Sequence, residues 1–130
     1  MIKIFLVEDQ ALVRDAVSAL LSLDFNIDVI GQASNGLDAL NAINALDEDA
    51  MPDIILTDIE MPKMNGIELS EKIAMQFPAI KMVIMTTFSR AGYIRRSLSA
   101  GVKGFILKEA PSDELINALK KVMQGQKVID

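Results

Sequence analysis

Three carboxylates in this sequence directly follow runs of apolar residues. Glu8 and Asp9 follow the first apolar run, and Asp58 follows a run near the middle of the chain. Three carboxylates packed together would repel one another and raise each other's pKa unless a cation neutralised them. Mg²⁺ suits such a set because it accepts one or two carboxylates beside water and phosphate oxygens. The residues therefore predict a Mg²⁺ site where Asp58 could act as the nucleophile toward a phosphoryl group.

Hydroxyl and ammonium groups end two later apolar runs. Thr86 and Thr87 close one of these runs, and Lys108 closes the last. A lysine there could pair with one phosphoryl oxygen as a point charge, and a threonine hydroxyl could bond another. All these residues would meet at one edge if the runs were parallel strands, because ligands bind beyond the carboxyl ends of such strands.

Each residue also has an ordinary structural interpretation. Asp9 could cap a helix that begins near Gln10. Asp58 could be a turn aspartate before a loop that contains Pro62 and Gly66. The lysine and the threonines could be routine residues at strand ends. Their coincidence at four strand ends of one predicted sheet favours the chemical interpretation.

Composition limits the other kinds of chemistry. The 130 residues suit one domain, and the chain has no histidine and no cysteine, which excludes the usual zinc sites, Ser-His triads and thiol nucleophiles. A net charge of −5 weighs against a nucleic-acid grip within this chain. The apolar runs are too short to cross a membrane. Without cysteines or a signal-peptide pattern, we expect a cytoplasmic protein without a membrane partner.

The apolar pattern predicts an α/β domain. Five segments read as strands: 2–7, 27–30, 53–57, 81–85 and 104–107. Several are nearly continuous apolar runs, which are typical of parallel strands covered on both faces. Segments with helical spacing alternate with them, so the fold class is a parallel α/β sandwich.

The helical segments carry their own signals. One apolar stripe is predicted to face the core: Val13, Ala16, Val17, Leu20 and Leu21. Asn65 followed by Glu68 resembles the capped start of a helix that stops near Pro78. Pro111 with the acidic residues after it suits the first turn of a last helix that ends near Gly125.

These motifs together resemble the receiver domain of two-component response regulators, over essentially all of residues 1–130. The resemblance rests on IFLVEDQ, LTDIEMPKMNG, the MTTF strand end and the GFILKE strand end. It implies a flavodoxin-like, doubly wound sheet of five parallel strands in the order 2-1-3-4-5. It also implies phosphotransfer from a sensor histidine kinase and regulation of an output, not turnover of a metabolite.

The same resemblance assigns roles in the site. Asp58 is then the phosphoacceptor, and Mg²⁺ is bound by Asp9, Asp58 and the backbone carbonyl of Glu60. Glu8 acts on the metal through water, and Lys108 pairs with the phosphoryl group.

The resemblance also implies a switch. Thr86 is then the switch hydroxyl and Phe105 the switch aromatic, while the backbone at Ile59 and Thr87 contacts the phosphoryl group. Thr87 stands where alanine is commoner in the family, so phosphoryl access could be tighter here.

The final 31 residues resemble the NarL/FixJ group of these regulators. That group's organisation implies a C-terminal helix-turn-helix output domain outside this chain, DNA binding through that domain only, and a homodimer favoured by phosphorylation. The candidate dimer residues are Leu12, Ile116 and Met123, with Leu23 nearby. From the residues alone, a core role and a dimer role are equally open.

Three rival functions remain to be weighed. An aspartyl phosphohydrolase would carry D-x-D on its first strand, whereas this chain has D-x-E on the third. A phosphorylation-independent interaction module would lack part of the acidic set or the lysine. A nucleotide-binding domain would need a glycine-rich phosphate loop, which the sequence lacks.

Overall fold

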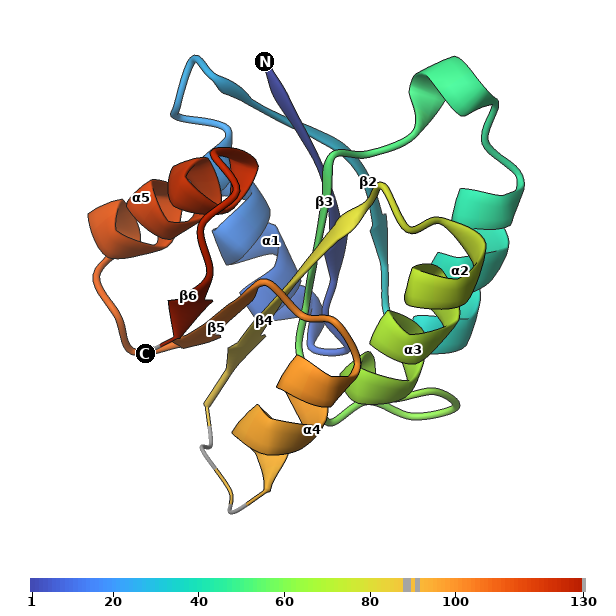
Figure 1. Cartoon of the computed structure of the whole chain (residues 1–130). Coiled ribbons are helices and arrows are strands. Elements are labelled where there is room, and N and C mark those ends of the chain that lie inside the picture. Colours follow the sequence, from blue (N-terminus) through green and yellow to red (C-terminus); the bar gives the residue numbers. More distant parts are fainter. Residues whose placement is uncertain (88–89, 91, 130) are drawn as a thin grey trace.

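A computed structural model describes residues 1–87, 90 and 92–129 of the chain. Its core is one parallel sheet in the order β2-β1-β3-β4-β5-β6 (Figure 1). The strands are β1 (Ile2–Val7), β2 (Ile27–Ala33), β3 (Ile54–Thr57), β4 (Lys81–Thr86), β5 (Gly104–Leu107) and β6 (Val128–Ile129). The predicted order of the first five strands is confirmed.

The sixth strand was not predicted. β6 has only two residues, Val128 and Ile129, which pair with Gly104 and Phe105 of β5. Val128 N–H donates to the Lys103 carbonyl at 3.0 Å, which brings the exit segment to the edge of the sheet. A strand this short has no periodicity that a sequence pattern could reveal.

Helices cover both faces of the sheet (Figure 1). They are α1 (Ala11–Leu21), α2 (Gly36–Asn44), α3 (Gly66–Gln76), α4 (Tyr93–Ser99) and α5 (Ser112–Met123), with a short 3-10 turn, η1 (Glu48–Ala50). α1 and α5 lie on one face, and α2, α3 and α4 lie on the other. The alternation of strand residues therefore divides the core into two layers. Phe105 belongs to the layer under α2, α3 and α4, and Ile106 belongs to the layer under α1 and α5.

The apolar stripe of α1 is less buried than its pattern predicted. Only Leu21 is fully buried, Val13, Val17 and Leu20 are half-buried, and Ala16 is exposed. The reason is a groove of about 170 Å³ between α1 and α5, lined in part by Ala16, Val17 and Leu20. Three residues of the stripe therefore border this groove, which is also lined by Met85 and Ile106 of the sheet.

Helix starts follow the predicted chemistry where side chains can act as caps. Asn65 and Glu68 form a complete capping box, with Asn65 Oδ1 accepting from Glu68 N–H at 2.8 Å and Glu68 Oε1 accepting from Asn65 N–H at 3.0 Å. Two backbone donors of the helix start are thereby satisfied. α3 is consequently fixed directly behind the loop that follows β3.

Candidate phosphoacceptor and metal site

The candidate site lies at the carboxyl edge of the sheet, where β1, β3 and β5 end. The Asp58 N–H donates to the Val7 carbonyl at 3.1 Å, and the Lys108 N–H donates to the Thr86 carbonyl at 2.8 Å. These bonds continue the ladders one residue past the strands, so the backbones of Asp58 and Lys108 are fixed relative to β1 and β4. These strand ends lie together at one edge of the sheet, as the sequence predicted.

Three carboxylates meet at this edge. One oxygen each from Glu8, Asp9 and Asp58 lies within 4.8 Å of the others. Glu8 and Asp58 are buried, with 1% and 8% of their surface exposed, whereas Asp9 is exposed. The cluster therefore has a buried floor and one ligand at its open side.

Asp9 is not a helix cap. The N-cap of α1 is Gln10, and it makes no side-chain cap bond. The nearby backbone donor, Gln10 N–H, is taken by Glu8 Oε2 at 3.0 Å. The exposed Asp9 carboxylate thus has no role in starting α1.

Lys108 joins the two buried carboxylates. Its Nζ lies 2.8 Å from Asp58 Oδ2 and also donates to Glu8 Oε1. Burial by itself would lower the pKa of Lys108, but the hydrogen bonds to Asp58 and Glu8 outweigh it and raise the pKa. The ammonium group therefore stays charged and offsets part of the negative cluster.

Glu8 has the opposite balance. Burial raises the pKa of its carboxyl group above the ordinary value, although the hydrogen bonds from Lys108 and Gln10 N–H act against this. The Glu8 backbone carbonyl also accepts from Arg14 Nη1 at 2.6 Å. Sequence reasoning missed Arg14, whose position near the start of α1 was the available signal.

The acceptor loop is held by short contacts around Asp58. Asp58 Oδ1 accepts from Ile59 N–H at 2.7 Å, and the Asp58 carbonyl accepts from Thr57 Oγ1 at 2.8 Å. Gly66 packs so closely that an added Cβ would lie 2.0 Å from the Asp58 carbonyl oxygen. Lys63 adopts a left-handed φ of 67°, which is unfavourable for a residue with a Cβ. The loop conformation is therefore tightly specified.

The predicted switch residues are both buried. Thr86 is 3% exposed and Phe105 is 1% exposed, with Phe105 in the core layer under α4. Ile59 is buried, and its N–H is already committed to Asp58 Oδ1. Thr87 is exposed at the end of β4.

The donor set fits Mg²⁺. All three converging ligands are carboxylate oxygens, and the cluster includes an exposed member through which a hydrated ion could enter. Hard oxygen ligands with room for water are what Mg²⁺ requires. Among the described residues, Lys108 is the cation that forms ion pairs with carboxylates of this cluster.

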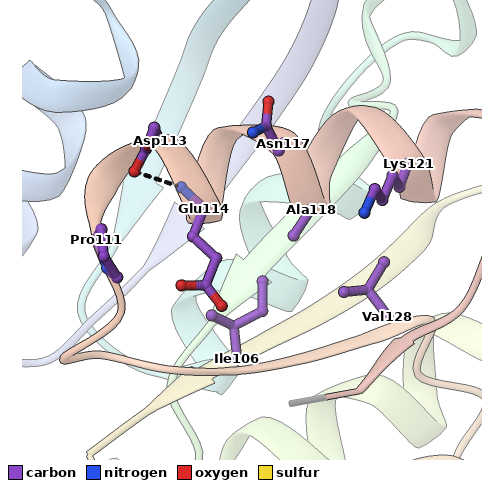
Figure 2. Close-up of a pocket in the computed structure, with 8 residues that line it drawn as sticks. All are labelled: Ile106, Pro111, Asp113, Glu114, Asn117, Ala118, Lys121 and Val128. Atoms are coloured by element: carbon purple, nitrogen blue, oxygen red, sulfur yellow. Dashed lines mark hydrogen bonds between the residues drawn. The ribbon is translucent and has the colours of Figure 1, made fainter.

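A separate hollow lies away from this edge, between α5 and the strands β5 and β6 (Figure 2). It has a volume of about 360 Å³ and is lined by Ile106, Pro111, Asp113, Glu114, Asn117, Ala118, Lys121 and Val128. Its floor is apolar, and its charged members are exposed residues of α5. Val128 is the β6 residue that lines the hollow, and the lining offers no converging set of reactive groups.

The candidate dimer residues differ in exposure. Leu12 and Leu23 are 84% and 81% exposed. Ile116 and Met123 are half-buried and pack against the core layer under α1 and α5. Among the described residues, no helix is long and apolar enough to cross a membrane.

Comparison with known proteins agrees with this geometry. The response regulator receiver domain family matches residues 4–120. The transcriptional regulatory protein DesR of Bacillus subtilis is 40% identical over 128 residues, which are 98% of this chain and 61% of DesR. The response regulator VraR of Staphylococcus epidermidis is 33% identical over 129 residues, covering 99% and 60% of the two chains. The chain thus spans about three fifths of the length of these relatives.

Solved structures share the fold. A LuxR-family DNA-binding response regulator from Staphylococcus aureus superposes with a TM-score of 0.85 at 33% identity, covering 94% of this chain and 98% of the other. The receiver domain of the putative regulator NarL from Mycobacterium tuberculosis gives a TM-score of 0.88 at 26% identity, covering 96% and 98%. The resemblance to receiver domains of the NarL/FixJ group is confirmed by these matches. The chain belongs to the response regulator receiver domain family, and its relatives are transcriptional regulators of the NarL/LuxR group.

Proposed function

We propose that Asp58 accepts a phosphoryl group from the phosphohistidine of a sensor histidine kinase, with Mg²⁺ bound beside it. The observation that carries this proposal is the meeting of Asp58 with Lys108 and two further carboxylates at one sheet edge. These 130 residues contain no histidine, so the phosphohistidine must lie outside them.

In the transfer step, Asp58 Oδ2 forms a bond to phosphorus while the phosphorus–nitrogen bond of the donor breaks. The electron pair of that bond stays on the donor imidazole nitrogen. Oδ2 is the oxygen that Lys108 contacts, so the ammonium group can pass to a phosphoryl oxygen as the new bond forms. Hydrolysis by water would restore Asp58, which makes the domain a catalyst of its own dephosphorylation.

The metal would be held by Asp9, Asp58 and the backbone carbonyl of Glu60, with Glu8 acting through water. When bound, Mg²⁺ supplies neutralisation of the charge that collects on the phosphoryl oxygens. Thr86 Oγ1 and the backbone N–H groups of Ile59 and Thr87 would contact the phosphoryl group. The Ile59 N–H must then be shared with Asp58 Oδ1, its partner in this structure.

The output step uses the buried pair at β4 and β5. A new dianion on Asp58 would draw the Thr86 hydroxyl inward, and Phe105 would repack beneath α4. We propose that this change regulates transcription through a helix-turn-helix domain outside this chain, since the relatives DesR and VraR are regulators longer than the matched segment.

Mass spectrometry of the intact protein tests the acceptor assignment. Acetyl phosphate with Mg²⁺ should add one phosphoryl mass to the wild type and none to Asp58→Asn, because an amide cannot form the acyl phosphate. Asp15→Asn is the matched control, since Asp15 is an exposed aspartate of α1. Equal modification of Asp58→Asn and the wild type would refute the assignment.

We further propose that phosphorylation favours a homodimer through α1 and α5. Exposed Leu12 and half-buried Ile116 and Met123 support this surface. The ion pair between Lys120 Nζ and Asp24 Oδ2, at 3.1 Å, connects α5 to the turn that follows α1. The two helices can therefore act as one surface.

Sedimentation with and without beryllofluoride tests the dimer. We expect a shift toward dimer in the wild type and no shift in Ile116→Asp or Leu12→Asp. Leu12→Asp keeps the test valid if the half-buried Ile116 position disturbs folding. Met75→Asp, at an 81% exposed position of α3, is the control that should still dimerise. A monomeric wild type under both conditions would contradict the proposal.

A further inference from the structure

Glu60 lies two residues after Asp58, but its carboxylate is directed elsewhere. Glu60 Oε1 accepts a hydrogen bond from the Tyr93 hydroxyl at 2.8 Å. Arg90 Nε lies 3.4 Å from the same oxygen. The carboxylate cluster comprises Glu8, Asp9 and Asp58 and does not include Glu60. The side chain of Glu60 thus joins the acceptor loop to the start of α4.

Tyr93 is well placed to donate this hydrogen bond. It is the first residue of α4, and its half-buried ring packs against the core layer that contains Phe105. The Arg96 guanidinium lies 5.1 Å from the centre of the ring, within reach of a cation–π contact. The ring is therefore held independently of its hydroxyl, and removing the hydroxyl alone should leave the ring in place.

The charges around Glu60 favour this orientation. Arg90 and Arg96 both lie on the α4 side of the carboxylate, whereas three further carboxylates lie on the Asp58 side. A fourth carboxylate among them would add repulsion. The surrounding charges and the hydrogen bond from Tyr93 therefore favour the same orientation of the Glu60 carboxylate.

We propose that Glu60 and Tyr93 are a positioning pair that couples the metal site to α4. By the proposed function the Glu60 backbone carbonyl would bind Mg²⁺, and the Glu60 carboxylate accepts from Tyr93, so one residue would connect the two places. Tyr93 fixes the side chain of Glu60 and thereby helps to place the carbonyl. This inference rests on the proposed function only through the assignment of that carbonyl as a metal ligand.

Coupling of this kind is reciprocal. If the Tyr93 hydroxyl improves Mg²⁺ binding by some factor, Mg²⁺ must strengthen the contact of Glu60 with Tyr93 by the same factor. A hydrogen bond to an exposed charged group supports an effect of about three- to tenfold on Mg²⁺ affinity. Both directions of the coupling can be measured.

Tyr93 is its own reporter, because the chain has one tyrosine and no tryptophan. A phenol that donates to a carboxylate fluoresces more weakly than one that faces water. We therefore expect Mg²⁺ titration of the wild type, without any phosphodonor, to reduce tyrosine emission further. Glu60→Ala should start brighter and lose the response. Glu71→Ala removes an exposed glutamate of α3 and should respond as the wild type does.

A double-mutant cycle measured by calorimetric Mg²⁺ titration completes the test. Tyr93→Phe and Glu60→Ala should each weaken Mg²⁺ binding about three- to tenfold, and the double variant should bind no more weakly than either one. Tyr93→Phe should melt at nearly the wild-type temperature, because its ring contacts remain. Asp9→Asn, which removes a proposed direct ligand, should lose more affinity than either variant.

The outcomes separate the two proposals. Wild-type Mg²⁺ affinity in Tyr93→Phe, or full additivity in the double variant, would overturn the positioning pair even if Asp58 is phosphorylated. A wild type that shows the coupled Mg²⁺ response but takes no phosphoryl group would support the pair and refute the proposed function.

Discussion

Two helices flank the acceptor loop, and they are anchored very differently. α3 has eleven residues, a complete capping box and five buried positions, among them Ile67, Leu69 and Ile73. α4 has seven residues, is preceded by the N-cap Gly92 with a left-handed φ of 88° and no side-chain cap bond, and buries only Ser97.

The hydroxyl groups inside the two helices show the same contrast. Ser70 Oγ donates to the Gly66 carbonyl at 2.7 Å in the first turn of α3. Ser97 Oγ is buried in α4 without a hydrogen-bond partner among the described residues. A helix with few buried residues and an unsatisfied polar group opens more readily. The comparison indicates that α3 is firmly held behind Asp58, whereas α4 can move more readily.

The largest expected effect concerns the glycines that begin the two helices. Gly66→Ala should lower the free energy of unfolding by more than about 3 kcal/mol, because its Cβ would overlap the Asp58 carbonyl. Gly92→Ala should cost only about 1–2 kcal/mol, because it meets conformational strain with open space around it. Urea denaturation measures the loss of stability in both variants. Equal losses would mean that the chain is packed equally closely at the starts of the two helices.

The helix caps give the next contrast. Asn65→Ala removes the side-chain oxygen that accepts from Glu68 N–H, leaves only the bond from the residue 65 N–H to Glu68, and should cost about 1 kcal/mol. Gln10→Ala, at the N-cap of α1, should cost almost nothing because Gln10 makes no side-chain cap bond. Thermal melting compares the two variants. A larger loss of stability in Gln10→Ala would contradict the conclusion that α3 is anchored by its cap.

The two buried serines should respond with opposite signs. Ser70→Ala should lower the free energy of unfolding by about 1 kcal/mol through loss of a buried hydrogen bond. Ser97→Ala should raise it by up to about 1 kcal/mol, because no protein bond is lost among the described residues and a buried polar atom is removed. Urea denaturation again gives the sign, and destabilisation by both substitutions would remove the distinction.

The smallest expected effect is the pH dependence that Glu8 contributes to the metal-free protein. Burial raises the pKa of Glu8 above its value of 4.5 in a model peptide, so the folded state binds this proton more tightly than the unfolded chain. The resulting stability is present below pH 4.5 and is lost as pH rises through the folded pKa.

Glu8→Gln should abolish this component of the pH dependence, and Glu71→Gln should preserve it. Denaturation at a series of pH values from mildly acidic to neutral compares them. A parallel pH profile for Glu8→Gln and the wild type would show that Glu8 titrates alike in the folded and unfolded states.

The sequence predicted the parts of the structure that follow from local rules, including the start of α3. The strand runs, the Asn65–Glu68 cap and the convergence of Asp58 with Lys108 follow from periodicity, capping chemistry and parallel topology. Local pattern failed where burial depends on neighbours that are distant in sequence. Ala16 and Val17 fit a core stripe, but the spacing of α1 from α5 leaves a groove beside them.

The contacts of α4 were also beyond sequence reasoning. Glu60 and Tyr93 are 33 residues apart, and their hydrogen bond depends on how α4 sits against the acceptor loop. The sequence predicted that Lys108 would lie near the carboxylates. It could not predict that Lys108 bridges Glu8 and Asp58, because these contacts depend on side-chain rotamers. The contacts of α4 with the acceptor loop are thus the part that only the three-dimensional structure reveals.

Hydrogen exchange with peptide mass spectrometry, before and after treatment with acetyl phosphate and Mg²⁺, tests the central claim most directly. The peptide that contains Asp58 should gain the phosphoryl mass. Amides of α4, at residues 93–99, should change their exchange rates, while those of α3, at residues 66–76, should stay protected. A phosphoryl group found on another peptide, or equal changes in α3 and α4, would contradict the account.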